Sequence, residues 1–186
     1  MEGDRMKCEI CSTDTVRVRF GNQSLCMDCY NALMAAKLGI ELPELSKTFA
    51  ADDANGVKRI FEVERQITGT AILLTARERW ELGYEFAVDG ELDVDQHKLF
   101  EQLKEKTTRS LSETYLEKGE FPSGEPYTYV KQHHLKGVLT YDSDNPEGPL
   151  VIIDGKPYTW NEVGHLLQAF EGFQVKIVMK DLADEL

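Results

Sequence analysis

All cysteines of the chain lie in one short stretch, CEICSTDTVRVRFGNQSLCMDC, as two C-x-x-C pairs separated by fourteen residues. The four candidate metal ligands are Cys8, Cys11, Cys26 and Cys29. A thiolate is a soft anion, and four thiolates complete the tetrahedral shell of a zinc ion. The spacing therefore predicts one zinc site. Two disulfides, a rubredoxin-like iron site and a thioredoxin-like redox pair are the alternatives.

Short elements around the cysteines would bring the two pairs together. TVRVRF alternates apolar residues with Arg17 and Arg19 and predicts a strand, GNQS predicts a turn, and LCMDC leads back to the metal. CYNALMAAKLG predicts a helix that ends at Gly39. With its four cysteines, the segment 6–40 resembles the treble-clef and zinc-ribbon modules. The resemblance implies that the second pair lies at a helix N-terminus, where free N–H groups favour thiolates.

The expected role of this metal is structural. A zinc ion with four protein ligands has no open position for water, so such a site does not favour Lewis-acid catalysis. A module of about 40 residues also buries too little core to fold without a metal or a disulfide. We therefore expect the zinc to stabilise the fold and to take no part in a reaction.

Composition and charge limit the possible classes of protein. The chain is 41% hydrophobic and 29% charged, as is typical of soluble globular proteins. No apolar run approaches the roughly 20 residues of a membrane span, and MEGDRMKCEI lacks the apolar core of a secretory signal. We therefore expect a cytoplasmic protein without membrane attachment, in which thiols stay reduced.

The net charge of −12 disfavours binding to nucleic acid, because that binding depends on Lys and Arg neutralising phosphates. The basic residues around the cysteines would form only a modest patch: Arg5, Lys7, Arg17 and Arg19. A protein partner is the expectation instead.

The residues after the cysteines predict a connector and then alternating strands and helices. Pro43 and the turn-like DDANG indicate a connector over residues 41–57. RIFEVERQI, TAILLTARERW and YEFAVDG predict strands. A long helix is then expected from the capping pair Asp93 and Gln96 to Gly119.

The C-terminal third predicts one more helix between strands. After the break at FPSGEPY, LVIID predicts a buried strand and DG a tight turn. Thr159 and Glu162 match a capping box for a helix that is expected to end at Gly172. FQVKIVMKD, with its alternating apolar residues, predicts a final half-buried strand.

These elements predict an α+β fold, a zinc module followed by a mostly antiparallel sheet with two helices. The expected divisions are a zinc-binding module at 1–40, a connector at 41–57 and an α+β domain at 58–186, with a possible boundary near residue 120. The body also loosely resembles uncharacterised bacterial proteins in which a zinc module precedes an acidic α+β domain. That likeness implies no activity.

The chain has few residues arranged for catalysis. It lacks the P-loop, the dinucleotide-binding fingerprint, the nucleophile elbow and the H-E-x-x-H motif. The remaining candidates for a hydrolase or transferase site are His133 and His134 with Asp142 and Asp144. Adjacent residues of a strand point to opposite faces, so both histidines would share one site only at a bulge.

We therefore expect a non-catalytic protein-interaction module. Nucleic-acid binding through the zinc hairpin and the hydrolase or transferase site are the alternatives. The expected contact face is the hairpin of residues 16–24 with the helix of residues 29–38. Its apolar residues could contact a partner or pack on the body: Met27, Leu33, Met34 and Leu38.

Overall fold

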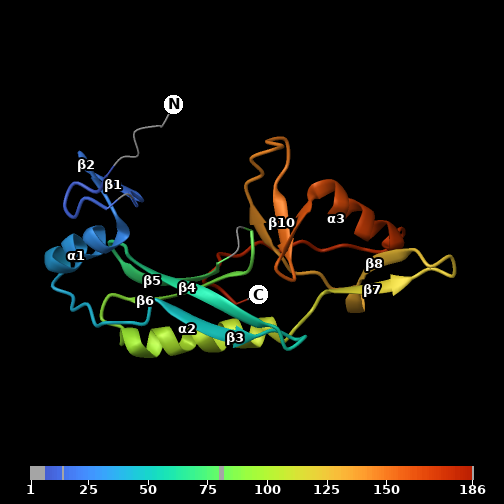
Figure 1. Ribbon diagram of the computed structural model, residues 1–186, viewed down its shortest axis with the longest axis horizontal. Helices are drawn as coiled ribbons and strands as arrows, with labels where there is room; N and C mark the ends of the chain where they lie inside the picture. The colour runs from blue at the N-terminus through green and yellow to red at the C-terminus, as the bar shows by residue number, and fades with distance from the viewer. Residues whose placement is uncertain (1–6, 14, 80–81, 186) are drawn as a thin grey trace.

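The computed structural model describes residues 7–13, 15–79 and 82–185. Figure 1 shows three parts in chain order: a small hairpin followed by a helix, a four-stranded sheet on a long helix, and a second group of strands with a short helix. The first and third parts lie at opposite ends of the long axis. The described residues form antiparallel strands and three α-helices, so the predicted α+β class is confirmed.

The first part has the hairpin and the helix that the sequence predicts. β1 (Val18–Phe20) and β2 (Gln23–Leu25) pair antiparallel. α1 (Met27–Leu38) follows directly. Gly39 ends α1 in the left-handed conformation with φ 70°, and its N–H donates to the carbonyl of Ala35. The predicted end of this helix is confirmed.

The second part is a four-stranded antiparallel sheet in chain order. Its strands are β3 (Thr48–Asp52), β4 (Lys58–Ile67), β5 (Ala71–Glu78) and β6 (Glu85–Glu91). β3 lies within the segment 41–57 that was predicted to be a connector, so that segment belongs to the sheet from Thr48 on. The alternation of apolar and polar residues in β3 is a weak signal, because only Phe49 and Ala51 lie on its half-buried face.

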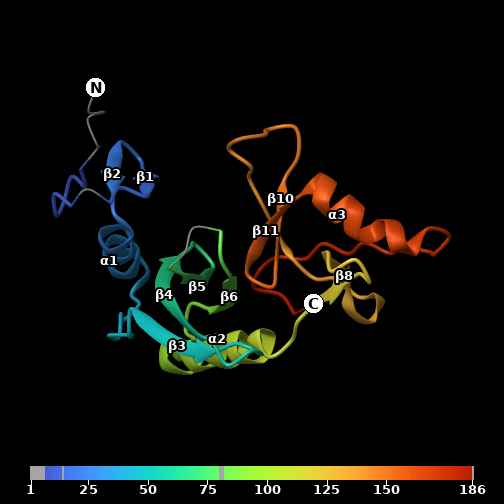
Figure 2. The same ribbon diagram turned by 45° about the vertical axis from the view of Figure 1, so that its right-hand side comes forward.

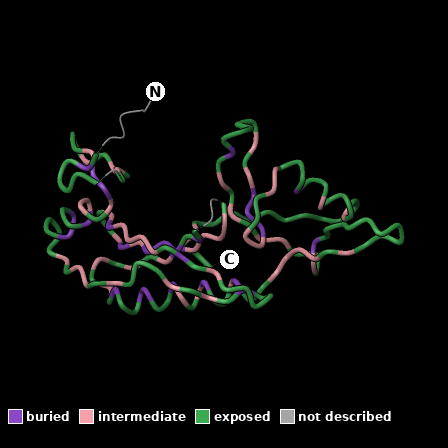
Figure 3. The backbone as a smooth tube through the Cα atoms, in the orientation of Figure 1, coloured by how far each residue is buried: buried purple, intermediate pink, exposed green. Residues whose placement is uncertain are grey.

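α2 (Gln96–Leu111) covers one face of this sheet (Figures 1 and 2). The core lies between the helix and the strands, where Figure 3 shows most of the buried backbone. Its largest fully buried side chains are Phe61, Ile67, Ile72, Leu74, Leu99, Leu103 and Leu111. Among the described residues, no helix combines the length and the apolar character that crossing a membrane requires.

α2 is shorter than predicted at both ends. The carboxylate of Asp95, rather than that of Asp93, caps the helix by accepting from the N–H groups of His97 and Lys98. The helix ends at Leu111 rather than near Gly119. The following residues leave the helix because they pair as a strand, so the prediction of a helix through residue 119 is wrong.

The third part contains two small antiparallel sheets. The first is the hairpin of β7 (Leu116–Glu120) and β8 (Pro126–Val130), which the 3₁₀ turn η1 (Lys131–His133) follows. The second pairs β9 (Val138–Thr140), β10 (Leu150–Ile153) and β11 (Lys156–Thr159) in the order β11-β10-β9. The strands after the first part therefore form three sheets rather than the single sheet that was expected.

The last helix begins as predicted and ends early. α3 (Trp160–Leu167) has the complete capping box of Thr159 and Glu162, which confirms that prediction. It continues only into the 3₁₀ turn η2 (Gln168–Phe170), before Gly172.

The predicted final strand at FQVKIVMKD is wrong. Residues 173–180 have no regular structure, and Val175, Ile177 and Met179 are 66–78% exposed. The ends of this segment are nevertheless held. Phe173 packs edge-on against Phe170, and the ammonium of Lys106 donates to three carbonyls of the residues 182–184. A strand needs a neighbouring strand to accept its hydrogen bonds, and an alternating sequence does not supply one.

Candidate metal centre

The four cysteines come from the two segments that the sequence predicts. Cys8 and Cys11 lie in a tight turn where the N–H of Cys8 donates to the carbonyl of Thr13, and the N–H of Ser12 to that of Cys8. Cys26 is the N-cap residue of α1, and its sulfur accepts from the N–H of Cys29 at 3.5 Å. The second pair therefore lies at a helix N-terminus, as the resemblance to treble-clef modules implies.

The sulfur atoms converge on one point. All four Sγ atoms lie within 4.8 Å of one another, and those of Cys11 and Cys26 are 3.6 Å apart. A tetrahedral zinc site with bonds of about 2.3 Å requires sulfur atoms about 3.8 Å apart. The four cysteines are free thiols, so the structure forms no disulfides among them. The cluster is suited to hold one metal ion.

The cluster is half enclosed by the small core of the module. Cys8 and Cys26 are buried, together with Leu25, whereas Cys11 is exposed. The backbone N–H groups of Cys11 and Cys26 lower the pKa of the Cys8 thiol to about 6. Burial and the neighbouring sulfurs raise the pKa of Cys29. Because metals bind thiolates, occupation of the cluster would release the protons that these thiols hold.

Hydrogen bonds join the first cysteine pair to the hairpin. The N–H of Glu9 donates to the carbonyl of Ser24, and the carboxylate of Glu9 accepts from the N–H of Ser24 at 2.9 Å. In addition, the N–H of Arg17 donates to the carbonyl of Leu25. A short backbone network thus positions the segments that carry the sulfurs.

Asn31 joins the module to the four-stranded sheet. It is buried on α1, and its side-chain amide donates to the carbonyl of Arg65 and accepts from the N–H of Ile67. These two bonds satisfy backbone groups at the end of β4, beyond its pairing with β3. The sequence analysis missed Asn31, although its position on the same helix face as Met34 and Ala35 could have identified it.

The apolar residues of the expected contact face separate into two groups. Met34 is buried in the core of the sheet, and Met27 is half-buried. Leu33 and Leu38 are exposed, and so is Ile10 in the cysteine turn, at 51%. Arg17 and Arg19 are exposed on the hairpin, and Arg5 lies outside the described residues.

The histidine candidates do not form one site. His133 packs against the rings of Phe170 and Phe173, whereas His134 packs edge-on against Tyr115. The two residues lie in a turn and not in a strand, and His133 has a positive φ of 57°.

The carboxylates downstream serve their own loop. Asp142 is buried, and its carboxylate accepts from the N–H groups of Asp144 and Asn145. Within the part of the chain that the structure describes, the four cysteines are the only group of three or more His, Cys, Asp or Glu side chains that converge as metal ligands would.

Three family models match the chain, each described as a domain of unknown function. DUF7685 matches residues 7–41, which contain the hairpin and α1. DUF7686 matches residues 43–112, which contain the four-stranded sheet and α2. DUF7713 matches residues 115–184, which contain the remaining strands and α3. Comparisons with curated proteins and with solved structures gave no match. The chain is thus similar to three families, none of whose descriptions states an activity.

Proposed function

We propose that Cys8, Cys11, Cys26 and Cys29 bind one structural zinc ion, and that the module so formed binds a protein partner without catalysing a reaction. The observation that supports this most directly is the convergence of four free thiols within 4.8 Å. Thiolates favour zinc among the common divalent ions. Because free thiols persist under reducing conditions, the proposal includes a cytoplasmic location.

The non-catalytic role follows from the number of protein ligands. Catalytic zinc keeps one position for water or substrate, whereas four cysteines fill a tetrahedral shell. Two of the four cysteines are also buried, which restricts the approach of a substrate to the ion.

The module has a free surface for a partner. The hairpin and the cysteine turn lie at one end of the molecule and away from the third part (Figure 1). Ile10, Leu33 and Leu38 present apolar side chains there. Apolar side chains that stay exposed near a rigid metal site favour a protein partner, because nucleic acid would require a larger excess of cations.

Metal analysis and cobalt substitution test the zinc site. Purified protein should contain one zinc per chain, and Cys26→Ser should lose it. In the cobalt form, absorption should show four thiolate ligands in tetrahedral geometry, unchanged by added azide. A spectrum that changes with azide would indicate an open position and would contradict a structural ion.

Paired surface variants test the partner. Leu33→Asp should keep its zinc but lose the proteins that the native chain retains from a cell extract, whereas Cys26→Ser should lose both. The matched control is Leu167→Asp, which changes a leucine of similar exposure on α3. If the same proteins are retained by all variants, or if only nucleic acid is retained at low salt, the proposed interaction is wrong.

A further inference from the structure

A second candidate site lies where the four-stranded sheet meets the third part of the chain. A cavity of about 960 Å³ opens there, at the upper end of the size range of small-molecule sites. One wall contains Asp53, Arg59 and Tyr84 from the sheet, and the other contains Tyr115, Lys156 and Tyr158 from the third part. His134 also lines the cavity, whereas His133, Asp142 and Asp144 do not.

One close contact joins the two walls, and hydrogen bonds within the second wall support it. At the β10–β11 turn, Gly155 lies on the ring of Tyr84 so closely that a Cβ atom there would be 2.4 Å from Cε2. Within the wall of the third part, the carboxylate of Asp154 accepts from the N–H groups of Tyr115 and Leu116 and so holds this turn against the start of β7. The cavity is therefore formed before any ligand binds.

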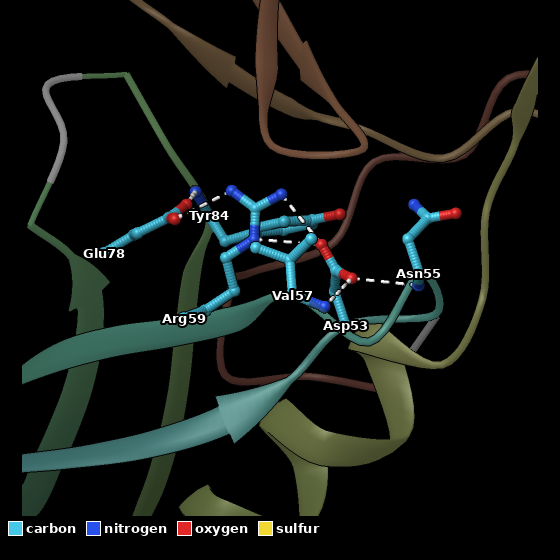
Figure 4. A network of polar contacts seen from close by, with 6 residues as sticks. All are labelled: Asp53, Asn55, Val57, Arg59, Glu78 and Tyr84. Atoms are coloured by element: carbon cyan, nitrogen blue, oxygen red, sulfur yellow. Dashed lines mark hydrogen bonds and ion pairs between the residues drawn. The ribbon is translucent and has the colours of Figure 1, made fainter.

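The wall from the sheet contains a partly buried ionic network (Figure 4). The guanidinium of Arg59 donates to the carboxylate of Asp53 at 2.8 and 3.0 Å and to that of Glu78 at 3.0 Å. It also lies over the ring of Tyr84, 5.7 Å from the centroid. Nε and both terminal nitrogens of Arg59 are thus engaged, so this residue shapes the site rather than receiving a ligand.

The charge of the lining differs from that of the chain. Five of the fifteen lysines and arginines of residues 48–186 line the cavity, but only four of the twenty-six aspartates and glutamates. These four carboxylates all have partners within the protein. They are Asp53, Glu113, Glu117 and Asp154.

Hydrogen-bond donors, in contrast, remain available. Among the described residues, Lys118 and Lys156 have no ion pair, and the hydroxyls of Tyr84 and Tyr158 have no hydrogen-bond partner. Burial raises the pKa of Tyr84 to about 12, so this hydroxyl keeps its proton at neutral pH. A ligand that uses these groups must supply several acceptor oxygens and negative charge.

We propose that this cavity binds a small polyanion, which carries phosphate or carboxylate groups and contacts Lys118 and Lys156. The two lysines neutralise its charge, and the two tyrosine hydroxyls donate hydrogen bonds to its oxygens. The site is separate from the cysteine cluster, so it adds a ligand-binding role to the proposed zinc module.

Calorimetric titration of the full chain with pyrophosphate and with citrate tests the site. We expect one of the two to bind with a stoichiometry of one, and the identity of that probe separates a phosphate site from a carboxylate site. The double variant Lys118→Gln/Lys156→Gln should weaken binding at least tenfold. The control is Lys98→Gln, which changes an exposed lysine of α2 outside the cavity.

Two results would overturn the proposal: no binding of either probe to the native chain, or equal binding to the native chain and the double variant. Thermal unfolding of each variant shows whether the fold is kept. Zinc content is measured in the same samples, so failure of this site and failure of the metal site are distinguishable.

Discussion

At the scale of single residues, Asp53 illustrates how a charged group becomes part of a core. Its side chain is only 4% exposed. Burial raises the pKa of this carboxyl, but the guanidinium of Arg59 and the N–H groups of Val57 and Asn55 outweigh burial, so the pKa is lowered overall. A lowered pKa in the folded state stabilises the protein above the unfolded pKa of about 3.9, and this contribution is lost as the pH falls through the folded value.

Asp53→Asn should therefore lower the free energy of unfolding at pH 7 and make it less dependent on pH. We expect a loss of about 1.5–3 kcal/mol at pH 7, the typical contribution of a hydrogen bond to a charged group. Urea unfolding at pH 7 and pH 3 measures both effects, and the native chain should lose more stability between these values than the variant does. Asp52→Asn, an exposed neighbour, is the control. A variant that keeps the full acid dependence would contradict this account.

Individual residues were predictable from the sequence where spacing in the chain determines their contacts. The cysteine cluster follows from two short motifs and a hairpin. The network of Arg59, Asp53 and Glu78 does not, because Glu78 approaches Arg59 only through the register that pairs β4 with β5. The lining of the cavity depends on contacts of still longer range, between the sheet and the β10–β11 turn.

At the scale of elements, Asn31 decides how firmly α1 is attached to the sheet. Asn31→Ala removes both side-chain hydrogen bonds. The carbonyl of Arg65 and the N–H of Ile67 then lose their side-chain partner. We expect a loss of about 1–3 kcal/mol for such buried groups. Hydrogen exchange should become faster in α1 while one zinc per chain remains. Asn161→Ala on α3 is the control, and equal exchange in α1 for both variants would show that Asn31 does not attach the helix.

The capping box of α3 gives a second prediction at this scale. Thr159→Ala removes the hydroxyl that accepts from the N–H of Glu162 at 3.2 Å. Loss of such a cap costs about 1 kcal/mol. The melting temperature should fall, and exchange should accelerate in the first turn of α3. Thr108→Ala, an exposed threonine on α2, should change neither quantity, and an unaffected α3 in Thr159→Ala would refute the role of the cap.

The elements that the sequence predicted correctly are those that local bonds determine. The end of α1 at Gly39 and the capping box of Thr159 each depend on hydrogen bonds between residues no more than four positions apart. The errors lie where a distant partner decides. Residues 116–120 leave the predicted helix to pair with β8, and FQVKIVMKD alternates like a strand but has no strand beside it.

At the scale of the whole molecule, a few side chains join parts that are far apart in the sequence. The ammonium of Lys106 on α2 donates to the carbonyl of Ala87 in β6 and to carbonyls of the residues 182–184 near the C-terminus. Just before β6, Gly155 rests on Tyr84. The third part is thus attached to the rest of the molecule at two places, the β10–β11 turn in the middle of its segment and the residues 182–184 at its C-terminal end.

A comparison of two glycines tests the contact between Gly155 and Tyr84. Gly56 and Gly155 have nearly the same backbone, with φ of 75° and 70°, but an added Cβ would meet nothing within 4 Å at Gly56. Gly56→Ala should therefore cost only the left-handed conformation, about 1–2 kcal/mol. Gly155→Ala should cost a further 1–3 kcal/mol, about the penalty of overpacking, because its Cβ would overlap the ring of Tyr84.

Tyr84→Ala tests whether the ring causes the additional loss of stability in Gly155→Ala. The free energy of unfolding in urea is measured for the single variants and for the double variants that combine each glycine change with Tyr84→Ala. If the turn rests on the ring as described, removing the ring should reduce the cost of Gly155→Ala to that of Gly56→Ala. The cost of Gly56→Ala should not change when Tyr84 is removed. An excess that persists without the ring would show that the two parts meet elsewhere, and the cavity between them would then have a different shape.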